Sequence, residues 1–126
     1  MKKQIVLTVK NKSEVIYLPL NKILYIQADG NYCDIHLTDG SVINTLTYQR
    51  AEIARMMKEQ LPEMYWSRFA MLGRFYMVNK DYILRIQPGK QQLTFVANSF
   101  GTIQKITIKA TAKALDLLEK EMEDKP

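Results

Sequence analysis

The sequence is poor in the two residue types that build disulfides and most metal sites. Its 126 residues include one cysteine, Cys33, and one histidine, His36. A disulfide needs two cysteines and a zinc site needs several Cys or His ligands, so neither is expected. A Ser-His-Asp site would depend on His36, which we place at the surface beside Asp34, and no Gly-rich motif for nucleotide phosphates is present. We therefore expect no cofactor, no metal and no enzyme activity.

Long apolar runs are also missing. Hydrophobic residues make up 47% of the chain, but they come in short runs, and Met1-Lys2-Lys3 leads directly into alternating sequence. We expect neither a transmembrane helix nor a signal peptide, and we place the chain in the cytoplasm. The length and the 25% content of charged residues predict a single globular domain over residues 1–126.

The charge is positive and unevenly distributed. The net charge is +5, with 15 Lys and Arg against 8 Asp and Glu in residues 1–110, and 3 against 5 in residues 111–126. The excess of basic residues therefore belongs to the body of the chain. Such an excess favours a nucleic-acid partner, because neutralising phosphates supplies much of the affinity for DNA, although many basic proteins bind no nucleic acid.

Most of the chain alternates apolar and polar residues in short segments that are bounded by Gly, Asn, Asp or Pro, a pattern typical of strands. Cys33 alternates with Ile35 and Leu37, which predicts a buried core thiol. Segments 23–46 are expected to pair as a meander. The predicted strands are an opening hairpin over residues 3–18, then Ile23–Ala28, Tyr32–Leu37, Val42–Leu46, two strands around Gly73, Asp81–Ile86, Gln91–Ala97 and Thr102–Lys109.

Two segments have helical spacing instead. The first is predicted to begin near Thr47 or Tyr48, with Thr45 or Thr47 as its N-cap, and to end at Pro62. Its basic residues are interpreted as a solvated face, because no second helix precedes it at helix-turn-helix spacing. The second is predicted to follow Thr111 as N-cap, with Leu115, Leu118 and Met122 on its apolar face. Between them, residues 63–67 are expected to form a loop in which Trp66 anchors the core.

The stretch Arg68–Ile83 places basic and aromatic residues within an apolar run. Its apolar residues predict two short strands, and Gly73 between them lets the backbone bend and project Arg74 outward. A guanidinium group in that position suits phosphate oxygens or the edge of a guanine base.

Two motifs in the chain resemble the LytTR family, the DNA-binding output domain of many bacterial response regulators. The residues from Phe69 to Ile83 follow its signature "F-x-R-I-H-R-S-Y-I-V-N-x-D-Y-I", and Ile23–Tyr32 follows "I-x-Y-I-E-A-D-G-N-Y". The resemblance covers residues 15–118. It implies a mostly β fold of about nine or ten short strands, with one middle helix and one C-terminal helix.

The resemblance also implies a function, namely sequence-selective binding of promoter DNA as a transcriptional regulator. Loops along one edge of the fold would enter successive grooves, and these loops correspond here to residues 29–32, 72–75 and the segment leading into the last helix. Thr111 lies in the segment that leads into the last helix. In the first loop, Asp29-Gly30-Asn31 is explained equally well as residues that merely close a hairpin. The expected DNA contacts are Asn31, Tyr32, Arg74, Lys109 and Lys113.

Three positions depart from the signature and keep a second hypothesis open. Met71 stands where the family often has Arg, Gly73 where it has His, and Phe75 where it has Ser. The fold could therefore serve as a protein-interaction or dimerisation module. A basic groove at the edge would favour DNA binding, and an apolar patch there would favour the module.

The expected partners are double-stranded DNA, a second copy on DNA and a soluble or membrane-bound protein inhibitor. With no receiver domain in the chain, we expect control through abundance or a partner.

Overall fold

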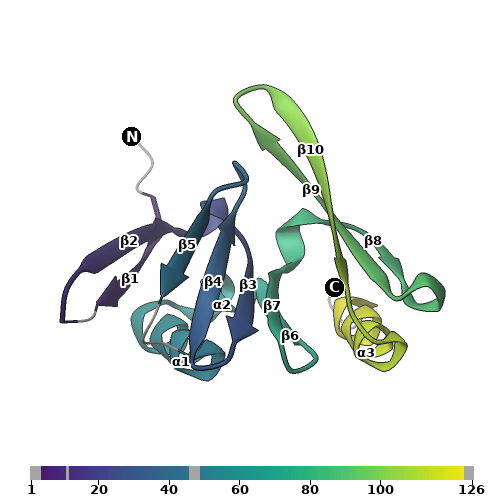
Figure 1. The fold of residues 1–126 in the computed structure, drawn as a ribbon, viewed down its shortest axis with the longest axis horizontal. Helices are drawn as coiled ribbons and strands as arrows, with labels where there is room; N and C mark the ends of the chain where they lie inside the picture. The colour runs from purple at the N-terminus through teal and green to yellow at the C-terminus, as the bar shows by residue number, and fades with distance from the viewer. Residues whose placement is uncertain (1–3, 11, 46–48, 124–126) are drawn as a thin grey trace.

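The computed structural model describes residues 4–10, 12–45 and 49–123, and within these residues the chain forms ten strands in three sheets (Figure 1). The mostly β fold and the number of strands are as predicted. The elements in chain order are β1 (Val6–Lys10), β2 (Val15–Pro19), η1 (Leu20–Lys22), β3 (Ile23–Asp29), β4 (Tyr32–Leu37), β5 (Val42–Thr45), α1 (Arg50–Gln60), α2 (Glu63–Trp66), β6 (Phe69–Leu72), β7 (Tyr76–Asn79), η2 (Lys80–Tyr82), β8 (Ile83–Gln87), η3 (Pro88–Lys90), β9 (Gln92–Ser99), β10 (Thr102–Lys109) and α3 (Ala112–Glu123).

The five-stranded sheet has the order β5-β4-β3-β7-β6, with antiparallel neighbours throughout. Strands β3, β4 and β5 form the predicted meander. The pairing of β3 with β7 joins segments about fifty residues apart in the sequence. In this pairing Tyr25 lies opposite Val78, and Gln27 lies opposite Tyr76. This pairing, which local pattern does not reveal, places the two family motifs on neighbouring strands.

The middle helix differs from the prediction at its start. Helix α1 begins at Arg50 with Gln49 as its N-cap, whose N–H donates to Glu52 Oε1 at 3.1 Å. The predicted start at Thr47 or Tyr48 lies outside the described residues. The alternative N-cap, Thr45, is instead buried in β5, where its hydroxyl donates to the carbonyl of Cys33 at 3.0 Å. A strand-edge hydrogen bond therefore takes the hydroxyl that was expected to cap the helix.

Two further segments differ locally. Residues 63–67 were expected to form a loop, but they include the one-turn helix α2 after Pro62. Trp66 packs from α2 against the core, as predicted, and the ammonium of Lys58 lies 5.0 Å from the centre of its ring. The strand expected from Asp81 starts at Ile83, because Asn79 caps the turn η2 by accepting a hydrogen bond from the N–H of Asp81.

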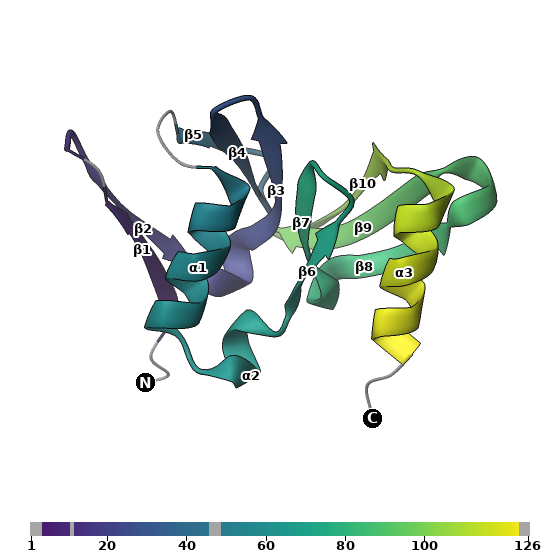
Figure 2. The ribbon, with the colours of Figure 1, turned by 90° about the horizontal axis from the view of Figure 1, so that it is seen from below.

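The C-terminal half forms the three-stranded sheet β10-β9-β8, against which α3 packs (Figure 2). Leu115 and Leu118 of α3 are buried, and Thr111 caps the helix as predicted by accepting a hydrogen bond from the N–H of Ala114 at 3.2 Å. An ion pair of 3.1 Å between Lys80 Nζ and Glu121 Oε2 ties the far end of the helix to the connection between β7 and β8. The helix is therefore fixed at both ends.

The buried side chains form two clusters, one beneath α1 and one beneath α3. Three stacked rings extend from β4 through β3 to β9. His36 lies 4.2 Å from Tyr25 and Tyr25 lies 5.3 Å from Phe95, measured between ring centres, with interplanar angles of 12° and 7°. Because Phe95 belongs to the three-stranded sheet, this stack joins that sheet to the five-stranded one.

The stack corrects the sequence interpretation of His36. We expected a histidine on the polar surface, but its ring is half-buried against Tyr25, the residue opposite it in the β3–β4 register. Its Nε2 atom is buried and has no hydrogen-bond partner within the described residues. The prediction for Cys33 is confirmed, since the side chain is fully buried, and burial raises the pKa of its thiol to about 11.

The burial of the His36 ring predicts that lowering the pH below neutrality destabilises the fold. Burial lowers the pKa of His36 from its ordinary value of 6.5, with Asp34 opposing the shift, so the folded chain resists a proton that the unfolded chain accepts. Stability should be constant above about pH 7 and should fall as the pH drops below about 6.5, where the unfolded chain takes up the proton that the folded chain resists. Thermal melting measures this directly. His36→Phe keeps an aromatic ring and should show a flat profile in that window; a flat profile for the unsubstituted chain would contradict the assignment.

Candidate nucleic-acid interface

Three connections meet at one edge of the molecule, at the bottom of Figure 1. They are the turn between β3 and β4, the turn between β6 and β7, and the segment from β10 into α3. The first two are fixed to each other because the N–H of Ala28 donates to the carbonyl of Phe75 at 2.6 Å. The third touches the second, since a Cβ at Gly73 would lie 3.6 Å from the Cβ of Ala114.

Glycine is favoured at position 73, in the turn between β6 and β7. Its φ of +60° lies in the left-handed region, where a side chain adds strain, and the first turn of α3 packs against it. A Cβ at this position would lie at an ordinary van der Waals distance from Ala114, so the backbone angle, more than the space, favours glycine. Because α3 packs beside this turn, Lys113, the residue before Ala114, lies near it.

Arg50, at the start of α1, holds the same turn from the other side. Its Nη1 atom donates to the carbonyl of Gly73 at 2.7 Å and to the carbonyl of Tyr76 at 3.1 Å. The sequence interpretation placed Arg50 on a solvated helix face. The structure instead makes it a positioning residue for the turn that carries Arg74, and only the long-range pairing of β3 with β7 brings it within reach.

A groove of about 670 Å³ lies between this turn and the start of α3. It is lined by Arg74, Lys109 and Lys113, so the structure brings together three of the five residues that were expected to contact DNA. All three side chains are exposed. Phe75 and Tyr76 also line the groove, so cations and aromatic rings face the same space. That combination can bind phosphates and stack against sugars or bases.

Gln91 also lines the groove, and sequence reasoning did not find it. It was expected to be the first residue of a strand, but it follows the turn η3 with a φ of 55°. Its carbonyl accepts a hydrogen bond from the N–H of Ala110 at 3.1 Å, which fixes the backbone beside Lys109. Left-handed backbone at a residue other than glycine is uncommon and concentrates at functional sites.

Lys113 lies in the first turn of α3, where the partial positive charge of the helix end disfavours a cation. The exposed side chain gives no packing in return. An anion in the groove would be attracted both by this ammonium and by the free N–H groups at the start of the helix. The position therefore costs the helix some stability and favours a negatively charged ligand.

Asn31 and Tyr32 lie outside the groove but on the same edge, Asn31 in the turn between β3 and β4 and Tyr32 at the start of β4. Asn31 is exposed. The hydroxyl of Tyr32 donates to Asp29 Oδ2 at 3.2 Å, and this hydrogen bond is the main cause that raises the pKa of the phenol. Tyr32 would have to give up that bond to donate to a phosphate, so Asn31 is the better placed of the two.

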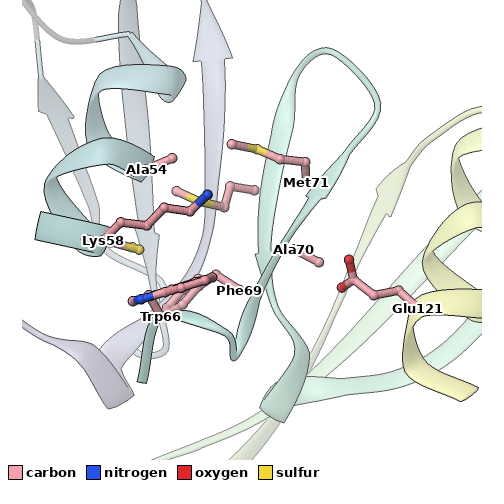
Figure 3. Close-up of a pocket in the computed structure, with 9 residues that line it drawn as sticks. Ala54, Lys58, Trp66, Phe69, Ala70, Met71 and Glu121 are labelled. Atoms are coloured by element: carbon pink, nitrogen blue, oxygen red, sulfur yellow. The ribbon is translucent and has the colours of Figure 1, made fainter. Parts of the chain in front are cut away.

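Met71 points away from the groove. Figure 3 shows its side chain extending from β6 toward Lys58 on α1, beside a hollow of about 280 Å³. The hollow is lined by Ala54, Met57, Lys58, Trp66, Phe69, Ala70, Met71, Met77 and Glu121. Met71 also borders a smaller hollow next to Lys113. The apolar residue at this signature position thus fills space between α1 and β6, and the basic groove is retained without it.

Arg74 is not held by the acidic residues near it in the sequence. Asp81 instead pairs with Arg68, whose Nε lies 3.7 Å from Asp81 Oδ2. Within the described residues there is no cluster of three or more His, Cys, Asp or Glu that could hold a metal ion. None of the described helices combines the length and the apolar character that crossing a bilayer requires.

Basic residues on loops at one edge of a mostly β fold define a class of DNA-binding domain. The family model for the LytTr DNA-binding domain matches residues 13–116, so the chain belongs to that family. Among solved structures, a LytTr DNA-binding domain from Bacillus cereus superposes with a TM-score of 0.55 at 18% identity, over 96% of this chain and 98% of that one. This likeness shows the same fold. Curated protein sequences contain no match.

The role of Arg50 can be tested by truncation. Arg50→Ala should lower the free energy of unfolding by about 1–2 kcal/mol, because two carbonyls at the turn lose a charged donor. Arg55→Ala is the matched control, since Arg55 is exposed on the same helix and forms an exposed ion pair with Glu59, at 3.9 Å. It should change stability by less than about 0.5 kcal/mol in a denaturant titration. Equal effects of the two substitutions would show that Arg50 does not support the turn.

Proposed function

We propose that the chain acts as one domain that binds promoter DNA sequence-selectively, as a transcriptional regulator in the cytoplasm. The observation that carries the proposal is the groove shared by Arg74, Lys109 and Lys113, on the edge that also carries Asn31. Membership of the LytTr family supports DNA as the ligand. The net charge of +5 supports a polyanionic partner.

The side chains on the three connections differ in chemistry, and each kind suits a different part of the DNA. Arg74 has a planar fork of donors at the tip of a rigid turn, which suits the two acceptors of guanine in the major groove. Lys109 and Lys113 present single ammonium groups, which suit phosphates and position the domain on the duplex. Asn31 and Gln91 have amide side chains that can both donate to and accept from adenine.

The alternative, an interaction module with a degraded DNA face, has less support at this edge. An apolar patch over the edge would favour it. The groove contains three cations, but apolar side chains line it as well, among them Leu72, Ala114 and the exposed ring of Phe75. Phe75 and Tyr76 place two aromatic rings among these cations, a combination that is common on nucleic-acid surfaces, where rings stack on bases or pack on sugars.

Binding should depend steeply on salt. If five to seven Lys and Arg side chains meet phosphates, the logarithm of the affinity should fall against the logarithm of salt concentration with a slope of about −5 to −6. Titration of pooled duplexes of random sequence, followed by fluorescence anisotropy, measures the slope. No binding at low salt would favour the interaction module instead.

Substitutions of Arg74 and of Lys113 should affect DNA binding in different ways. After the preferred site has been selected from random duplexes, Arg74→Ala should weaken binding to that site by about 1–3 kcal/mol and leave random-sequence binding nearly unchanged, because a base contact discriminates between sequences. Lys113→Ala should weaken binding to both and flatten the salt slope by about one unit.

Thermal melting provides the control for this pair. Arg74→Ala should melt like the unsubstituted chain, because its side chain is exposed at the tip of the turn. Lys113→Ala should melt at the same temperature or slightly higher, since it removes a cation from the start of α3. An equal loss on both kinds of duplex would make Arg74 a phosphate contact and would leave base reading to Asn31 and Gln91.

A further inference from the structure

The hairpin of β9 and β10 ends in an exposed aromatic residue. Ser99 pairs with Thr102, so Phe100 and Gly101 form a two-residue turn, with φ angles of 52° and 79°. The side chain of Phe100 is 98% exposed. Figure 1 shows the hairpin tip at the top of the molecule, opposite the edge that carries the basic groove.

Phe100 is unfavourable both in its backbone conformation and in the exposure of its ring. Turns with two positive φ angles favour Asn, Asp or Gly at the first position, and a bulky side chain in the left-handed region is strained. A fully exposed phenyl ring also gains nothing from burial within the chain. Asparagine at this position would remove both costs. A residue that is unfavourable locally and unsupported by packing is best explained by a contact outside the chain.

A hollow of about 180 Å³ lies directly beside the tip. Its lining comes from the hairpin and from the turn between β4 and β5: Lys22, Leu37, Thr38, Asp39, Asn98, Ser99 and Phe100. A cavity of about 150 Å³ holds a benzene molecule, so the hollow has room for one phenyl ring, which would meet Leu37 and Phe100 within an otherwise polar lining. The same small surface therefore presents a ring and a hollow of the size of a ring.

We propose that this tip is a self-association surface, in which Phe100 of each copy enters the hollow of a second copy about a twofold axis. In a twofold contact the same patch serves both partners, so a ring beside a hollow is complementary to itself. The charges agree with this arrangement, because the hollow contains one cation, Lys22, and one anion, Asp39. A patch of a single sign would repel its copy. Ile103, opposite Asn98 in the hairpin and 69% exposed, adds apolar surface beside the ring.

The contact leaves the basic groove free. Lys109 and Phe100 lie at opposite ends of β10, which spans roughly 25 Å at the usual rise of a strand. A contact centred on one ring buries less than the roughly 1,200 Å² of a stable interface, so the dimer should be weak. It should form at high protein concentration, or where DNA brings two copies together.

Sedimentation equilibrium without DNA, from micromolar to millimolar protein, tests the proposal. The unsubstituted chain should show a mean mass that rises from one copy toward two. Phe100→Asn should remain monomeric across the range and should melt at a higher temperature, because asparagine tolerates the left-handed region. Tyr17→Asn is the matched control, because Tyr17 is 68% exposed and lies on β2, far from Phe100 in the sequence. This variant should associate like the unsubstituted protein.

The outcomes separate this proposal from DNA binding. Phe100→Asn at low concentration should bind a short duplex as tightly as the unsubstituted chain, because the tip lies away from the groove. A chain that stays monomeric at millimolar concentration would overturn the proposal and would leave a different protein as the partner of Phe100. Association that survives in Phe100→Asn would also overturn it, since another surface would then carry the contact.

Discussion

The antiparallel pairing of β3 with β7 is the constraint on which the functional edge depends. It places the turn after β3 beside the turn before β7, and the hydrogen bond from Ala28 to Phe75 extends the pairing into those turns. Without it, the two family motifs would be separate hairpins with no fixed relation. With it, Asn31 and Arg74 share one edge, and Arg50 comes within reach of the carbonyls of Gly73 and Tyr76. One strand pairing thus converts two local turns into a single surface.

The second half of the surface depends on how α3 is held. The approach of Ala114 to Gly73 fixes the start of the helix, and the ion pair between Lys80 and Glu121 fixes its end. The aromatic stack of His36, Tyr25 and Phe95 then joins the sheet under α3 to the sheet that carries the turns. A groove lined from both sheets needs this junction, because an independent movement of either would separate Arg74 from Lys113.

Local pattern predicted the elements well, since alternation and turn residues are local properties. The hairpins around Gly30 and Gly73, the cap at Thr111 and the buried Cys33 all agree with it. Properties that depend on tertiary neighbours were not predictable in the same way. His36 is covered by a ring from the adjacent strand, and Arg50 bonds a turn that follows it by more than twenty residues. The candidate contacts Arg74, Lys109 and Lys113 came from the family resemblance, and Gln91, which has no motif, came from the structure alone.

The departures from the family signature have a common physical explanation in the packing of this edge. Gly73 suits the left-handed backbone of the turn, and α3 packs beside it, with Lys113 bordering the same groove as Arg74. Met71 gives up a cation, but it lies toward α1, where a charge would face Lys58 across an apolar hollow. Only Phe75 changes the chemistry within the groove itself, by adding a ring beside three cations. The positive charge of the edge therefore lies on three elements, at the turn with Arg74, at the end of β10 with Lys109 and at the start of α3 with Lys113.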